Sequence, residues 1–310
     1  FTRSFPIEIV GKLFLSRPRT HDFMAARTLL QLDSDVQPSS FDSIVAIDAG
    51  VDHLLRYGGV QVTNVLPLVH GAMFTRGGDE LKHTAIFIGG SDVDFAERLM
   101  DACRNAFFGP VRVSLMLDAN GCNTTAAAAV VASSRHVELP NAKSVVLGGT
   151  GPVGRRVAQL LASDGAQVAL TSRSLERAEY TCREVAAKVD GANLTPFAVG
   201  APGSMEQVLE DAEIVIACGA AGVELVSESL VRGAESLKVA IDLNAVPPAG
   251  IGGLAITDKA TPFGSGVGYG AIGVGGLKMK THRAAIQALF EANDRILDAA
   301  EIYNLAKAIG

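Results

Sequence analysis

The sequence predicts an α/β protein with two domains and a cleft between them. The chain has 310 residues, short apolar runs alternate with amphipathic stretches from Thr28 onwards, and a glycine-rich turn at residues 149–154 follows one apolar run. A chain of this length exceeds the usual size of one domain. The alternation is typical of parallel strands joined by crossover helices. We therefore expect an N-terminal α/β domain with a mainly parallel sheet and a second α/β domain around the turn.

The N-terminal domain is assigned to residues 25–125. Its helix signal is clear, because apolar side chains recur at i, i+3, i+4 and i+7 from Ala96 to Cys103, which predicts one buried face. Residues 1–24 lack the pattern of a secretory signal and are interpreted as a disordered extension. Apolar runs predict strands at Thr28–Leu32, Ser43–Ile47, His83–Ile88 and Val111–Leu117.

An alanine-rich stretch from Asn120 to His136 predicts a helix that ends before Pro140 and joins the two domains. The second domain, residues 126–280, contains a predicted helix at Gly154–Ser163. Its predicted strands are Ser144–Leu147, Gln167–Leu170, Glu213–Ala217 and Leu237–Asp242.

The end of the chain carries two further signals. Ten glycines between residues 250 and 276 are too many for the interiors of helices or strands, so we expect loops near the cleft. Residues 281–310 contain two helical stretches, Thr281–Ala292 and Asp298–Ile309, which we expect to pack back on the N-terminal domain.

Composition excludes several classes of function. A net charge of −6 with interspersed signs argues against a nucleic-acid partner. No apolar run approaches the roughly 20 residues of a membrane span, so we expect no membrane association. The four cysteines form no CxxC pair, which predicts no metal site and fits a cytoplasmic, reducing location.

The glycine-rich turn has the spacing of a dinucleotide-binding site. Gly149, Gly151 and Gly154 make a GxGxxG pattern that follows a predicted strand and opens a predicted helix. In such a Rossmann unit the glycines allow a tight turn, close approach of the pyrophosphate and close packing of helix on strand. The free N–H groups at the helix start attract the phosphates. The predicted cofactor-binding residues here are Gly149, Thr150, Gly151, Pro152, Val153 and Gly154.

The end of the next strand indicates which dinucleotide binds. An Asp or Glu there would bind the ribose of NAD, but this chain has Thr171, Ser172 and Arg173. Two hydroxyls and a guanidinium suit a 2′-phosphate, so these residues predict NADP. The alternative is an arginine on a solvated helix start.

Sequence motifs of other reaction classes, such as HExxH and GxSxG, do not occur. The polar residues that remain are Asp118, Asn120, Asn123 and Thr124 at a predicted strand end, and Lys278 after the last glycine loop. Ligands of open α/β sheets bind beyond the carboxyl ends of strands. We predict that the first four bind substrate and that Lys278 is catalytic, against the alternatives of a helix cap and a solvated lysine.

Segments spread from Thr28 to Ile309 resemble the NADP-dependent methylene-tetrahydromethanopterin dehydrogenases of methylotrophic bacteria, which are related to methylene-tetrahydrofolate dehydrogenases. Cys122 departs from the resemblance, since a serine is expected there. The segments that carry it are residues 32–35, Pro38-Ser39, Phe41-Asp42, Phe74–Gly78, Thr84–Gly90, Phe107–Pro110, Asp118–Thr125, Gly148–Gly154, Pro247-Pro248, Gly250–Gly253 and Gly275–Lys280.

The resemblance implies a homo-oligomeric enzyme that binds a pterin between its two domains. The implied reaction moves a hydride from methylene-tetrahydromethanopterin to NADP and gives methenyl-tetrahydromethanopterin and NADPH in one-carbon (formaldehyde) oxidation. The alternatives are a methylene-tetrahydrofolate dehydrogenase and a non-catalytic dinucleotide-sensing protein. A hydride leaves a carbon that is flanked by two nitrogens, whose lone pairs stabilise the resulting cation, so the step needs close alignment of donor and acceptor and no general base. We therefore expect Lys278 to orient the pterin and the rate to be flat between about pH 6 and 8.

Overall fold

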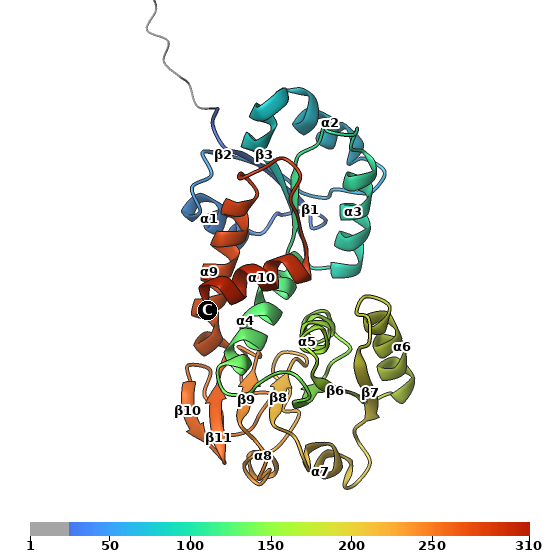
Figure 1. Ribbon diagram of the computed structural model, residues 1–310, viewed down its shortest axis with the longest axis vertical. Coiled ribbons are helices and arrows are strands. Elements are labelled where there is room, and N and C mark those ends of the chain that lie inside the picture. The colour runs from blue at the N-terminus through green and yellow to red at the C-terminus, as the bar shows by residue number, and fades with distance from the viewer. Residues whose placement is uncertain (1–24) are drawn as a thin grey trace, which may run out of the picture.

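The computed structural model describes residues 25–310 and has two lobes, each built on its own sheet (Figure 1). The predicted extension of residues 1–24 lies outside the described residues. The first lobe contains β1 (Thr28–Asp33), α1 (Ser40–Asp48), β2 (His53–Tyr57), α2 (Leu66–Phe74), η1 (Gly78–His83), β3 (Thr84–Gly89), α3 (Val93–Asn105), β4 (Ser114–Leu117) and η2 (Ala119–Gly121).

The second lobe contains α4 (Cys122–Ser134), β5 (Lys143–Leu147), α5 (Pro152–Ser163), β6 (Gln167–Ser172), α6 (Leu175–Ala186), β7 (Asn193–Ala198), α7 (Ser204–Leu209), β8 (Ile214–Ala217), α8 (Glu228–Arg232), β9 (Val239–Asp242), β10 (Lys259–Phe263) and β11 (Gly266–Tyr269). The chain ends with α9 (Ala271–Ala288), β12 (Ile296–Leu297) and α10 (Ala299–Ile309).

Both sheets are mainly parallel, as the sequence predicts. The first has the order β12-β4-β3-β1-β2, and all its strand pairs are parallel. The second has the order β10-β11-β9-β8-β5-β6-β7, in which only the pair of β10 and β11 is antiparallel. The order changes direction at β5, so the loops after β5 and β8 leave the sheet in opposite directions and form a crevice where ligands bind.

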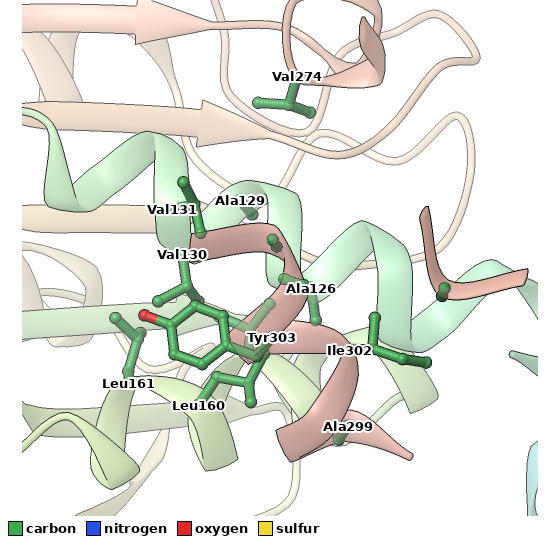
Figure 2. Close-up of a cluster of buried hydrophobic side chains, with 14 of the residues drawn as sticks. Ala126, Ala129, Val130, Val131, Leu160, Leu161, Val274, Ala299, Ile302 and Tyr303 are labelled. Carbon is green, nitrogen blue, oxygen red and sulfur yellow. The ribbon is translucent and has the colours of Figure 1, made fainter. Parts of the chain in front are cut away.

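Helices α4, α9 and α10 join the lobes. α4 is buried along nearly its whole length and packs against α5, α9 and α10, while α9 also contacts α1 of the first lobe. Figure 2 shows the apolar cluster at this junction, with Ala126 and Val130 of α4, Leu160 of α5 and Tyr303 of α10. Because small alanine side chains let the helices approach closely, the junction is packed like a protein interior.

The C-terminal segment contacts both lobes. β12 adds a parallel strand beside β4 of the first sheet. α10 packs on α4 and α5, and the Tyr303 hydroxyl donates a hydrogen bond of 2.7 Å to Asp164 at the end of α5. The predicted division at residues 125 and 280 falls inside α4 and α9, so each of these helices continues across it.

One strand prediction is wrong. Residues 43–47 lie in α1, where Ser39 caps the helix by accepting a hydrogen bond of 3.2 Å from the Asp42 N–H group. The apolar, β-branched run suggested a buried strand, but Ile44 and Ile47 are exposed and only one helical face is buried. The Ser39 N-cap and the helical spacing of the buried residues outweigh the β-propensity of the segment.

The expectation that residues 250–276 are all loops is also wrong. β10 and β11 form a hairpin, and α9 begins at Ala271, so Gly273, Gly275 and Gly276 lie inside a helix. A Cβ atom at Gly273 would come within 1.8 Å of the carbonyl oxygen of Asp258. The absence of a side chain at Gly273 therefore permits close packing of the helix start against the preceding loop.

Candidate active site between the two lobes

The glycine-rich turn joins β5 to α5 and is held against the end of β6. The N–H groups of Gly148 and Gly149 donate to the hydroxyl and carbonyl oxygens of Thr171, at 3.2 and 3.0 Å. α5 has Gly151 at its N-cap and Pro152 at its first position, and no side chain caps it. Its first N–H groups are therefore free for an anion.

The glycines of the turn are required for different geometric reasons. Gly148 has a φ of +65°, so the left-handed residue of the turn lies one position before the predicted Gly149. A Cβ atom at Gly154 would lie 2.6 Å from the Gly149 Cα atom, which explains both of these glycines as close contacts. A Cβ atom at Gly151 would meet nothing closer than 3.9 Å, so this position faces open space.

A cavity of about 1120 Å³ opens in front of this turn, and we call it the glycine-turn cavity. Thr150, Gly151 and Pro152 line it, whereas Val153 packs against the apolar core. Its other walls come from the loops after β6, β7 and β8: residues 172–174 with Arg177, residues 199–206, and residues 218–220.

The residues at the end of β6 divide into support and lining. Thr171 is buried and holds the turn, which corrects its predicted contact with a phosphate. Ser172 and Arg173 line the cavity. Arg177, one turn into α6, lines it as well and was missed by the sequence analysis. The signal that could have found it is Ser174, which caps α6 through the Arg177 N–H group and so fixes where that arginine lies.

A second cavity of about 340 Å³ lies at the ends of β1 and β3, and we call it the lysine cavity. The predicted Asn120 and Lys278 both line it. The Lys278 ammonium lies 4.4 Å from the centre of the Phe41 ring, and a Cβ atom at Gly121 would come within 3.1 Å of its nitrogen. Asn120 has a φ of +52°, which turns the chain at the wall of the cavity.

Three of the predicted substrate-binding residues are buried and support the cavity from behind. Asp118 accepts hydrogen bonds from the N–H groups of Asn123 and Thr124, at 2.9 and 3.0 Å, and from the Thr124 hydroxyl at 2.6 Å. This pattern caps α4. All three side chains have no exposed surface, so the structure corrects their predicted contact with substrate.

A buried polar network fixes Asn123. Its side-chain nitrogen donates hydrogen bonds to the Leu117 carbonyl oxygen and the Asp298 carboxylate, at 2.6 and 2.9 Å. Its side-chain oxygen accepts a hydrogen bond of 2.8 Å from Arg156 of α5. Arg156 also pairs with Glu97 of α3 at 2.5 Å. This network links α3, α4, α5 and α10, so it sets the position of one lobe relative to the other.

Three acidic residues line the lysine cavity: Asp33, Asp35 and Asp42. Sequence analysis did not select them, because they come from a strand, a loop and a helix with no motif in common. Burial raises the pKa of Asp42 to about 6, against the opposing influence of the Ser39 hydroxyl and the Lys278 charge. Burial also raises the pKa of Asp118 to about 7.

His282 lies one helical turn after Lys278 and is buried behind the cavity. Its ring stacks on Phe87 and neither ring nitrogen has a hydrogen-bond partner among the described residues. Burial and the Lys278 charge lower its pKa to about 3, so the imidazole is neutral. It adds no positive charge to the cavity.

A third cavity, of about 630 Å³, lies between the lobes and borders both of the others. It is lined by Ser91 to Asp94 of the first lobe and by Thr150 to Pro152 of the second. It shares the turn with the glycine-turn cavity and Ser91 with the lysine cavity.

Two absences bound the chemistry of residues 25–310. No group of three or more His, Cys, Asp or Glu side chains in this range is arranged to hold a metal ion. No helix in this range is both long enough and apolar enough to cross a membrane.

The sheet order, the uncapped helix start and the open position at Gly151 define a protein with a Rossmann dinucleotide-binding lobe. Comparison with known proteins agrees. Residues 40–120 match the family described as methylene-tetrahydromethanopterin dehydrogenase, N-terminal, and residues 131–249 match shikimate / quinate 5-dehydrogenase.

Two curated relatives from Methylorubrum extorquens match over most of the chain. The "bifunctional protein MdtA" is 44% identical over 92% of this chain and 99% of the relative. The "NAD(P)-dependent methylenetetrahydromethanopterin dehydrogenase" is 32% identical over the same shares. The chain belongs to the methylene-tetrahydromethanopterin dehydrogenase family.

Solved structures show more distant similarity. Quinate dehydrogenase from Corynebacterium glutamicum in complex with NAD is 16% identical and covers 90% of this chain and 98% of its own, with a TM-score of 0.49.

Proposed function

We propose that this chain oxidises methylene-tetrahydromethanopterin to methenyl-tetrahydromethanopterin with NADP as hydride acceptor. The observation that carries the proposal is the cleft itself, in which a cavity between the lobes shares lining residues with both the glycine-turn cavity and the lysine cavity. Two ligands that exchange a hydride require adjacent sites, with the reacting atoms about 3 to 3.5 Å apart. Family membership supports the pterin as the hydride donor.

The residues of the glycine-turn cavity fit a dinucleotide phosphate. The free N–H groups at the start of α5 would hold the pyrophosphate, and the open position at Gly151 leaves room for it. Arg173 and Arg177 would hold the 2′-phosphate together with Ser172. The bound dinucleotide supplies the acceptor for the hydride.

The pterin is assigned to the lobe of residues 25–125 and the dinucleotide to the lobe of residues 126–280. Asn120 and Lys278 would contact the pterin, because both line the lysine cavity. We assign Lys278 the task of orienting the ring. Its ammonium packs on Phe41, and its stem rises from α9, which is anchored in both lobes. Asp118, Asn123 and Thr124 hold the loop that carries Asn120.

The experiment is to follow absorbance of reduced nicotinamide with each methylene pterin and each dinucleotide. We expect the highest kcat/KM with methylene-tetrahydromethanopterin and NADP. A higher kcat/KM with methylene-tetrahydrofolate would favour the folate alternative. Dinucleotide binding without turnover of either pterin would contradict the proposal and favour a sensing protein. A cytoplasmic location and homo-oligomerisation stay predictions; gel filtration with light scattering tests the second.

A further inference from the structure

The lysine cavity carries more negative than positive charge. Its lining includes the three carboxylates of Asp33, Asp35 and Asp42 and the single ammonium of Lys278. The proposed reaction turns the neutral N–C–N unit of the methylene carrier into a methenyl cation. An excess of negative charge is therefore complementary to the product and to the transition state that precedes it.

The three carboxylates differ in what they already bind. Asp33 accepts hydrogen bonds from the N–H groups of Asp35 and Ser39, at 2.9 and 3.1 Å. Asp35 accepts from the N–H group and the hydroxyl of Ser91, at 3.1 and 2.9 Å. Both carboxylates thus hold loops in place, and these hydrogen bonds disperse their charge.

Asp42 differs, because the hydrogen-bonding group that lowers its pKa is the Ser39 hydroxyl at the N-cap of its own helix. It lies in the first turn of α1, and its carboxylate accepts no hydrogen bond from a backbone N–H group of the described residues. Its Oδ2 atom lies 3.7 Å from the point that a Cβ atom of Gly89 would occupy, at the end of β3. Asp42 is half-buried, and a charge in such a place is screened less than one on the open surface.

Lys278 creates the need for this charge. An ammonium that orients the pterin also repels the cation that forms on it, because like charges in a desolvated site raise each other's energy. Lys278 and Asp42 line the same cavity, and their charges interact. His282 behind them is neutral, so it leaves the balance between these two groups unchanged.

We infer that Asp42 is a catalytic residue of the proposed dehydrogenase, whose carboxylate stabilises the methenyl cation as the hydride leaves. The inference rests on the proposed function. The C–H bond at the methylene carbon breaks, and the hydride carries both electrons to the nicotinamide ring, where the new C–H bond forms. The positive charge of the oxidised nicotinamide passes to the N–C–N unit of the pterin. No proton is released, and Asp42 stays ionised throughout.

The test compares the binding of a charged and a neutral pterin to Asp42→Asn. The probes are methenyl-tetrahydromethanopterin, whose N–C–N unit is cationic, and methylene-tetrahydromethanopterin, whose N–C–N unit is neutral and whose tail is the same. We expect the affinity for the cation to fall at least tenfold, which is about 1.4 kcal/mol. The affinity for the neutral carrier should change less than twofold, and the single-turnover rate of hydride transfer should fall at least tenfold.

Two control variants separate charge from structure. Asp42→Glu keeps the charge and should restore most of the selectivity for the cation. Asp48→Asn removes a carboxylate from the exposed end of the same helix and should change neither affinity. Circular dichroism and NADP affinity verify that Asp42→Asn is folded.

Three outcomes decide the matter. Loss confined to the cation supports the inference. An equal loss for both pterins, or no loss for either in an active wild-type enzyme, overturns the role of Asp42 and leaves the proposed function standing. A wild-type protein that binds neither pterin overturns the proposed function itself.

Discussion

The glycine-turn cavity and the lysine cavity are built in opposite ways. The first presents backbone N–H groups at the start of α5, and the residues that form its turn are neighbours in the sequence. The second presents charged side chains from β1, α1 and α9, and its residues lie up to about 245 positions apart. A site made of backbone N–H groups tolerates side-chain substitutions, except where the new side chain would occupy the space of the ligand. A side-chain site depends on each group it contains.

The largest expected effect tests the backbone site. Gly151→Val should weaken NADP binding at least a hundredfold in calorimetry, roughly 2.7 kcal/mol, because the new side chain enters the open space in front of α5. The fold should survive, since the nearest atom to a Cβ here is 3.9 Å away. Gly154→Val is the contrast: its Cβ meets backbone at 2.6 Å, so it should lower the melting temperature. Normal NADP affinity in Gly151→Val would move the pyrophosphate elsewhere.

The next effect concerns the only charged side chains assigned to the dinucleotide. Arg173→Ala and Arg177→Ala should each raise KM for NADP about ten- to hundredfold through loss of a charge-assisted contact of about 1.5 to 3 kcal/mol. KM for NAD, which has no 2′-phosphate, should stay within about twofold. The exposed Arg183 of α6 lines the third cavity, between the lobes, but not the glycine-turn cavity. Arg183→Ala therefore serves as the matched control. An equal rise for both dinucleotides would contradict the phosphate role.

A smaller effect tests the side-chain site. Lys278→Met keeps most of the stem on Phe41 and removes the ammonium, so kcat should fall about tenfold while NADP affinity changes less than twofold. Lys280, exposed on the same helix, provides the control Lys280→Met with unchanged kcat. Loss of NADP affinity in Lys278→Met would show that the two cavities are not separate.

The smallest effect is on pH dependence, and here the structure revises the flat profile that the sequence suggested. Burial raises the pKa of Asp42 to about 6. Below that pH the carboxyl group binds a proton and loses the charge assigned to it. Its charged neighbours are Asp33, which raises its pKa, Lys278, which lowers it, and Asp118, whose own pKa Asp42 raises. We expect kcat/KM to rise with pH and level off above about pH 7, with a loss of about fourfold at pH 5.5.

Asp42→Asn should remove this fall in kcat/KM at low pH, which we call the acidic limb of the profile. A limb that persists in the variant and is centred near pH 7 would assign it to Asp118, whose pKa burial raises to about 7. In that case the buried cap of α4, and not the cavity wall, controls the titration.

Local sequence determined the parts of this protein in which neighbouring residues make the structure. Strands β1, β3, β4, β5, β6, β8 and β9, the amphipathic helix α3 and the turn between β5 and α5 are each specified within a few residues by hydrophobic pattern and glycine spacing. The same is true of Arg173, which follows a strand at the expected distance. Among the residues that line the glycine-turn cavity, local sequence indicated Thr150, Gly151, Pro152, Ser172 and Arg173 but not Arg177, and their contact with a dinucleotide stays a prediction.

Tertiary structure alone decided which polar groups face a ligand. Asp118 and Asn120 are two positions apart, yet one is buried beneath a helix cap and the other lines the cavity. Asp42 reaches that cavity only because α1 packs against α9, which carries Lys278. Period and propensity describe a residue's own element, whereas burial and electrostatics depend on every element packed around it. Gly273 is a further example. A side chain is excluded there by the carbonyl oxygen of Asp258, fifteen positions earlier, and local sequence does not show this contact.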